Sequence, residues 1–300
     1  MTDRPSQPIL FDRALMRARR HRAAPLFHDH DFLVRQAATG LAERLAGINR
    51  TFDRAINLGA YRGALWQAEP PIETVAEAIE CDLSAAMLSG SRPGLVVDEE
   101  WLPFRPQSLD LVTSLMTLHM VNDLPGALIQ IHRALRPDGL FLGALLGGET
   151  LTELRQAIGL AEIECEGGLS PRVAPFADIR DLGSLLQRAG FALPVVDAER
   201  LTVRYRDPLR LFRDLRGMAA TNMLVERRKQ PLRRATLQRC LEIYAEKFAL
   251  PDGRLPATFD ILYLTGWAPH ESQQKPLKPG SARMRLADAL RQPPQRPDES

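Results

Sequence analysis

A glycine turn near residue 60 is the part of the sequence whose residue types are best suited to binding a ligand. An apolar run ends at Leu58, Gly59 and Gly63 follow it, and a helix is predicted from Ala64. This pattern predicts a buried strand that ends in a tight turn. Glycine lets the backbone approach a ligand and take positive φ, and a helix start presents free N–H groups. The turn favours a nucleotide-like ligand, while a plain strand-to-helix connection explains the pattern equally well.

Carboxylates follow the next two predicted strands. Asp82 comes after a strand predicted over residues 74–81 and lies about 20 residues past the turn, where a carboxylate suits the hydroxyls of a ribose. Alternatively, Asp82 only caps the helix predicted to follow it. Asp98 and Glu99 come after a strand predicted over residues 94–97, where a carboxylate could accept a hydrogen bond from an adenine amino group.

Two segments contain histidines that could do chemistry. His119 follows a strand predicted over residues 109–115 and could act as a base or orient an acceptor, although a histidine packed on a helix explains it as well. The loop His28-Asp29-His30-Asp31 carries metal-ligating residue types, but adjacent ligands on one loop leave a metal shell incomplete. We therefore favour a polar loop with Asp31 as a helix cap, and predict no metal.

Alternating strand and helix signals surround these residues. Further strands are predicted over 139–146, 195–205 and 259–267, and helices over 11–24, 31–46, 151–166, 176–189, 208–218 and 231–249. Helical stretches are also expected between the first and second, second and third, and fourth and fifth strands. This alternation implies βαβ crossovers and a mainly parallel sheet covered on both faces. Ligands bind such sheets outside the carboxyl ends of the strands.

Composition bounds the class of protein. The 300 residues are 45% hydrophobic and 25% charged, as in soluble globular proteins, and a net charge of +2 does not indicate a nucleic-acid partner. The sequence contains no apolar run of about 18 residues, so no transmembrane helix is expected. The three cysteines lack metal or disulfide spacing, which fits a reducing, cytosol-like compartment. A basic run at residues 227–234 favours either an acidic partner or, more often, a solvated face.

Several short motifs together resemble a known superfamily. Asp82-Leu83-Ser84, Asp98, Leu102-Pro103-Phe104 and Arg136-Pro137-Asp138-Gly139 resemble successive motifs of class I S-adenosylmethionine (SAM)-dependent methyltransferases. Phe11-Asp12-Arg13, residues 118–125 and 147–151, Ser170-Pro171, Gly217-Met218, Gly266-Trp267 and residues 270–273 narrow the likeness. From about Phe11 to Ala282 the chain is similar to the methyltransferase-like assembly factor of respiratory complex I and its bacterial relatives. It more distantly resembles the carrier-protein methyltransferase of biotin synthesis.

The resemblance implies an α/β, Rossmann-like fold with a seven-stranded, mostly parallel sheet. N-terminal helices over residues 11–50 would precede a SAM-binding core over 51–150. Residues 151–282 would supply substrate-side helices, closing strands and a helical lid before the last strand, between disordered ends at 1–10 and 283–300. The implied cofactor is SAM, with contacts from Asn57, Gly59, Ala60, Tyr61, Gly63, Asp82, Leu83, Asp98, Glu99 and Leu115.

The glycine turn departs from the family pattern at two positions. Asn57 stands where the family has an acid, and Tyr61 stands where it has its middle glycine. Losing the acid weakens attraction to the ligand's ammonium group by about 1–3 kcal/mol. If the middle position needs positive φ, Tyr61 costs roughly 1–2 kcal/mol, and its ring could fill the space of the methionine tail.

Three functions follow from the resemblance. The first is methyl transfer from SAM to a protein substrate, with respiratory complex I assembly as the expected process. The second is hydroxylation of an arginine of a complex I subunit, and the third is an assembly protein that has lost its cofactor. The expected location is the bacterial cytoplasm, or the mitochondrial matrix in a eukaryote. The fold alone does not choose among these functions.

Overall fold

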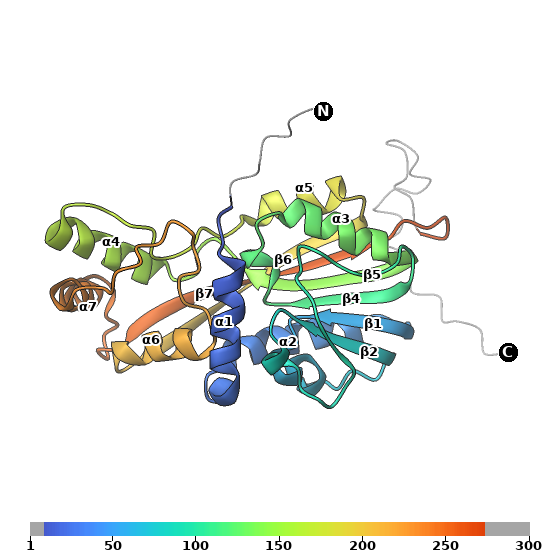
Figure 1. Cartoon of the computed structure of the whole chain (residues 1–300), viewed down its shortest axis with the longest axis horizontal. Helices are drawn as coiled ribbons and strands as arrows, with labels where there is room; N and C mark the ends of the chain where they lie inside the picture. The colour runs from blue at the N-terminus through green and yellow to red at the C-terminus, as the bar shows by residue number, and fades with distance from the viewer. Residues whose placement is uncertain (1–8, 274–300) are drawn as a thin grey trace, which may run out of the picture. The chain divides into compact units, whose positions relative to one another are not determined.

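A seven-stranded sheet forms the centre of the protein. The computed structural model describes residues 9–273, and its strands run in the order β3-β2-β1-β4-β5-β7-β6 (Figure 1). The strands are β1 (Phe52–Leu58), β2 (Val75–Asp82), β3 (Gly94–Val96), β4 (Leu109–Leu115), β5 (Leu135–Leu146), β6 (Ala192–Tyr205) and β7 (Leu255–Trp267). The first five are mutually parallel, and β7 pairs antiparallel with both β5 and β6. The Rossmann-like, mostly parallel sheet expected from the sequence is confirmed.

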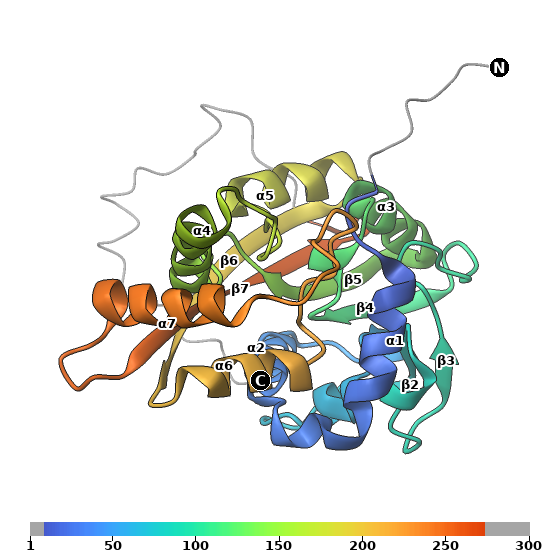
Figure 2. The same ribbon diagram turned by 60° about the vertical axis from the view of Figure 1, so that its left-hand side comes forward.

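Helices cover both faces of this sheet. The α-helices are α1 (Arg13–Ala23), α2 (Phe32–Ala46), α3 (Leu124–Ala134), α4 (Thr152–Glu166), α5 (Ile179–Arg188), α6 (Pro208–Gly217) and α7 (Arg234–Phe248). Figures 1 and 2 show α3 and α5 on one face and α2 on the other. Alternate residues of β5 separate accordingly: Leu140 and Leu142 pack in the core beside α2, and Phe141 and Leu145 in the core beside α3 and α5. Burial on both faces explains why residues 140–146 of β5 are continuously apolar.

Strand β1 lies at the point where the strand order reverses. Its register places Leu58 beside Cys81 of β2 and beside Ser114 of β4, so the three carboxyl ends meet at one edge of the sheet. Loops at such a switch point are where α/β sheets bind ligands. The glycine turn, Asp82 and the segment after β4 are thereby brought together although they are far apart in sequence.

The expected helical insertion before the last strand is present. Helices α6 and α7 lie between β6 and β7, and Figure 2 shows α6 close to α1 and α7 beside α4. Two residues of the basic run in this insertion are paired, Arg227 with Asp12 and Arg228 with Glu166, while Lys229, Arg233 and Arg234 are exposed. At the end of α5, Gly190 has a φ of 97°, as expected for a glycine that ends a helix.

Two expectations of helices were wrong. The connection after β1 is a 3₁₀ helix, η2 (Tyr61–Gln67), and the connection after β2 is the single 3₁₀ turn η3 (Ala85–Met87). Residues 61–63 all have positive φ, which prevents an α-helix from starting at the turn. Further 3₁₀ turns are η1 (Ala24–Asp29) and η4 (Leu118–Met120).

The histidine-rich loop pairs with neighbouring side chains. Asp31 precedes α2 but does not cap it, because its carboxylate contacts His28 and Arg35 instead. His30 Nδ1 lies 2.8 Å from Asp214 of α6. Among the residues that the structure describes, no group of three or more histidine, cysteine, aspartate or glutamate side chains is placed to hold a metal ion.

The chain divides into two units, and the structure describes residues 9–269 of the first, which is compact. From the second unit, 270–300, the structure describes only a short turn, in which His270 Nδ1 lies 2.7 Å from the hydroxyl of Ser272. The expected disordered N-terminus falls mostly, and the expected tail entirely, outside the described residues. Over residues 9–273 no helix is both long and apolar enough to span a membrane.

Candidate functional site

The glycine turn is held tightly against the end of β4. Gly59 has a φ of 86°, and a Cβ atom built on it would lie 2.3 Å from the carbonyl oxygen of Leu115. Tyr61 has a φ of 42°, so the middle position does take positive φ, at a cost of roughly 1–2 kcal/mol for a residue with a Cβ. The turn needs glycine at position 59 and tolerates tyrosine at 61 only with strain.

Asn57 stabilises this turn from inside. Its side-chain amide donates to the carbonyl of Gly59 at 2.9 Å, and its oxygen accepts from the hydroxyl of Thr113 at 3.0 Å. Asn57 is fully buried, so both polar ends of the side chain are satisfied by the protein. The oxygen that was expected to face a ligand is therefore used to hold β1 against β4.

Tyr61 and Arg20 fill the space above the turn. Arg20, which comes from α1, donates from Nη2 to the Tyr61 hydroxyl at 2.7 Å, and that hydroxyl donates to the carbonyl of Met116 at 2.7 Å. The Tyr61 ring stacks on Phe27 with centroids 5.4 Å apart. Tyr61 and Arg20 are 3% and 1% exposed, so neither side chain opens onto solvent.

Asp82 is paired with the same arginine. Its Oδ2 lies 3.1 Å from Arg20 Nη1, and its Oδ1 accepts from the Ser84 N–H at 2.9 Å. The second contact is local but is not the helix cap that the sequence offered as an alternative to ribose binding, because the 3₁₀ turn that follows has Ser84 at its N-cap and no side-chain cap. Burial raises the pKa of Asp82. Burial opposes the charge of Arg20 as well, but Asp82, Tyr61 and Glu99 hold the pKa of Arg20 above its ordinary value, so the guanidinium stays charged.

A second arginine of α1 pairs with the carboxylates that follow β3. Arg13 Nη2 lies 2.6 Å from Asp98 and also contacts Glu99. Glu99 Oε1 is 3.9 Å from Arg20, so the two pairs form one network of three carboxylates and two guanidiniums. Charge is therefore nearly balanced within the protein at the place where an adenosyl group was expected.

The remaining predicted contact residues are buried beneath this network. Ala60 and Leu115 have no exposed surface, and Ala60 donates its N–H to the carbonyl of Cys81 at 3.1 Å. Leu83 packs in a small core cluster with Phe11 and Met16. Gly63, with a φ of 84°, ends the turn. The structure thus brings the predicted residues together, while their contribution to a cofactor site stays a prediction.

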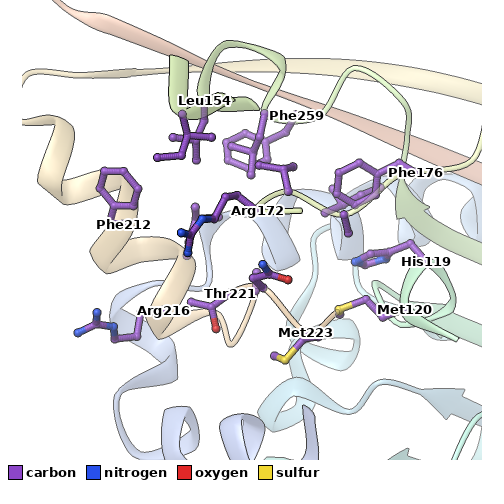
Figure 3. Close-up of a pocket in the computed structure, with 18 of the residues that line it drawn as sticks. His119, Met120, Leu154, Arg172, Phe176, Phe212, Arg216, Thr221, Met223 and Phe259 are labelled. Atoms are coloured by element: carbon purple, nitrogen blue, oxygen red, sulfur yellow. The ribbon is translucent and has the colours of Figure 1, made fainter. Parts of the chain in front are cut away.

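His119 lies apart from the network and lines a cavity. The cavity has a volume of about 230 Å³ and lies between the end of β4, helix α4 and the insertion (Figure 3). Phe176, Phe212 and Phe259 contribute to its mainly apolar wall. Desolvation, with a smaller effect of the Arg20 charge, lowers the pKa of His119 to about 3, so the imidazole is neutral near pH 7. Its Nδ1 is buried without a hydrogen-bond partner.

Sequence reasoning missed the two arginines that close the site. Arg13 was noticed only as part of a motif, and Arg20 was not singled out. Arg13, Met16, Arg20 and Ala23 recur with helical spacing, and Met16, Arg20 and Ala23 are the buried residues of α1. An arginine on the otherwise apolar stripe of a helix was the signal, because such a residue needs a buried carboxylate partner.

The sheet order, the glycine turn and the acidic residues after β2 and β3 define a class I methyltransferase domain. A family model described as a methyltransferase domain matches residues 57–143. Over 288 residues the chain is 41% identical to the mitochondrial arginine-hydroxylase NDUFAF5 of Danio rerio, covering 93% of this chain and 89% of that protein. This chain belongs to the NDUFAF5 family of methyltransferase-related proteins.

Other relatives support the same placement. The human NDUFAF5 protein is 41% identical over 281 residues, covering 91% of this chain and 81% of the relative. A malonyl-[acyl-carrier protein] O-methyltransferase of Laribacter hongkongensis is 34% identical over 289 residues, covering 90% and 94%. The fold matches a solved structure of a putative methyltransferase from Bacillus halodurans with a TM-score of 0.54 at 14% identity, covering 78% of this chain and all of that one.

The methyltransferase domain is therefore present as expected, and in this arrangement the side chains predicted to bind SAM bond to one another. Each oxygen of Asp82 already accepts one hydrogen bond from the protein and keeps a second lone pair for a ribose hydroxyl. The methionine tail would need the volume that Tyr61 and Arg20 occupy. Asn57 and Tyr61, which depart from the family pattern, thus both form hydrogen bonds within the protein. Arg20 is the residue that the structure adds to them.

Proposed function

We propose that this chain is an assembly protein that engages a protein partner during the building of respiratory complex I, without transferring a methyl group in the arrangement described. The family relationship supports the first part, since the likeness to NDUFAF5 proteins extends over the insertion and closing strands as well as the core. A respiratory partner implies the cytoplasm of a bacterium or the matrix of a mitochondrion.

The pair between Arg20 and Asp82 carries the second part of the proposal. A cofactor bound at the switch point would have to displace a buried, charged guanidinium from the carboxylates of Asp82 and Glu99 and from the hydroxyl of Tyr61. Breaking a buried ion pair costs about 3–5 kcal/mol, which is comparable to a large share of a cofactor's binding energy. The arginines of the network supply to its carboxylates the hydrogen-bond donors that a bound adenosyl group would otherwise supply.

The test is a gene deletion that is complemented with the natural chain. We expect loss of NADH-linked respiration and of assembled complex I on native gels, both restored by the natural gene. Mass spectrometry of complex I subunits from the two strains then separates the activities. No chain-dependent modification supports a non-catalytic assembly protein, a gained oxygen on an arginine supports hydroxylation, and a gained methyl group supports methyl transfer. Normal complex I in the deletion strain overturns the assembly role.

Methyl transfer remains the second candidate because the cavity beside His119 adjoins the methyltransferase core. The partnerless Nδ1 of His119 is suited to accept a hydrogen bond from an acceptor molecule in that cavity. This function requires that α1 withdraw Arg20 before SAM binds, so it predicts measurable SAM binding by the natural chain. The titration described in the Discussion distinguishes it from the first proposal.

A further inference from the structure

A groove between α1 and α6 is lined largely by arginines. Arg19 and Arg22 come from α1, and Arg213 and Arg216 come from α6, with His30 beside them. Arg213 pairs with Asp207 and His30 pairs with Asp214. Arg19, Arg22 and Arg216 form no ion pair with any residue in the described range 9–273. Three uncompensated guanidiniums on one concave surface favour an anionic ligand.

The cavity beside His119 adjoins this groove. The two share Arg216 and Thr221 in their linings. Arg19 Nη1 fixes the segment between them, because it donates to the Thr221 hydroxyl and to the Asn222 carbonyl, each at 2.6 Å. Figure 3 shows Arg216 pointing away from the apolar side chains that surround the cavity. An anion in the groove would therefore lie at the mouth of the cavity.

The interior of the cavity carries no uncompensated charge among the described residues. Arg172 reaches into it, but its Nε lies 2.7 Å from Glu162, so this guanidinium already has a carboxylate partner. Leu154, Phe212 and Phe259 form apolar walls. An apolar chain would be desolvated there, while a second charge would have no free partner.

We propose that the groove and the cavity together bind a single-chain anionic amphiphile, with its head group on Arg22 and Arg216 and its alkyl chain in the cavity. The head group pairs with arginines that no protein carboxylate neutralises, and the alkyl chain fills the apolar cavity that adjoins them. An acidic peptide would neutralise the arginines but leave the cavity empty. This site does not depend on SAM and is separate from the assembly role proposed above.

The test is calorimetric titration of the full chain with decanoate, decyl phosphate and decanol below their aggregation concentrations. We expect the two anions to bind at least about tenfold more tightly than decanol, because charge-assisted hydrogen bonds are lost with a neutral head. The ranking of decanoate against decyl phosphate then identifies the head group as a carboxylate or a phosphate. Decanol that binds as tightly as both anions, or no binding of either anion, overturns the proposal.

Two variants locate the ligand. Replacing Arg22 and Arg216 together by glutamine is expected to weaken anion binding about tenfold or more, while Arg17→Gln, on the exposed side of α1, leaves it unchanged. Ala220→Phe places a ring in the cavity and is expected to weaken binding similarly, provided that thermal unfolding shows a native fold. Undiminished binding in both the arginine variant and a folded Ala220→Phe variant would place the amphiphile elsewhere and overturn the assignment.

Discussion

The guanidinium of Arg20 lies 3.1 Å from the carboxylate of Asp82, and both side chains are closed off from solvent. The arginine comes from the first helix of the chain and the aspartate from the end of the second strand. Their contact places a protein cation at the position where this class of fold ordinarily holds the ribose of a cofactor. Stability and ligand binding are therefore coupled at one pair of residues.

Removing one partner of this pair is expected to destabilise the fold. Asp82→Ala leaves Arg20 buried without its nearest carboxylate, and we expect a loss of about 3–5 kcal/mol in the free energy of unfolding. The double variant with Arg20→Leu should lose less than the sum of the two single variants, since neither charge is then left unpaired. Urea denaturation measures all three, with Arg17→Leu as an exposed control. Additive losses would mean that the two residues do not interact.

SAM binding is expected to depend on the residues that fill the cleft. The natural chain should show no calorimetric binding at concentrations up to about 1 mM, a free-energy bound of about 4 kcal/mol. Asn57→Asp with Tyr61→Gly restores the usual turn, and adding Arg20→Ala frees Asp82. We expect binding to appear first in the triple variant. Micromolar binding by the natural chain would instead show that the network opens readily and would favour methyl transfer.

Gly59 is expected to resist substitution. Gly59→Ala places a Cβ atom 2.3 Å from the Leu115 carbonyl at a φ of 86°, so β1 and β4 must move apart. We expect a loss of about 2–4 kcal/mol, from backbone strain and disturbed packing together. Gly148→Ala is the matched control, because nothing lies within 4 Å of the added atom. Equal stability of the two variants in thermal unfolding would contradict this description of the turn.

The stability of the protein is expected to fall in mild acid because of His119. Its pKa is lowered from 6.5 to about 3 in the folded state, so below about pH 6.5 the unfolded chain binds a proton that the folded chain does not. Between pH 7 and pH 5 this difference should cost about 1–2 kcal/mol. The share of the loss due to His119 should disappear in His119→Gln, while the share due to His132, whose pKa burial also lowers, should remain. The full loss should persist in His21→Gln, which changes an exposed histidine. Urea titrations at the two pH values provide the comparison, and an unchanged pH dependence in His119→Gln would show that His119 is solvated.

Local patterns in the sequence determined the fold and the edge at which its loops meet. Segments rich in apolar residues, such as 55–58 and 109–115, predict buried parallel strands, because a strand covered on both faces is mostly apolar. The sequence also predicted that residue 61 could take positive φ, because Tyr61 stands where the family motif has its middle glycine. Helices between the first three strands were predicted wrongly. After β1, three successive residues with positive φ leave no room for an α-helical turn, and after β2 only the short turn η3 forms.

Only the tertiary structure decided what occupies the site. Arg20 and Asp82 are 62 residues apart, and nothing local to either specifies the other. The position of α1 depends on packing against the insertion, where Asp12 donates its N–H to the carbonyl of Met223 at 2.9 Å. Sequence periodicity reports which side of a helix is buried, but the partner of a buried charge is set by long-range packing. The sequence therefore indicated a cofactor edge, and the fold shows that an arginine from the chain itself lies in it.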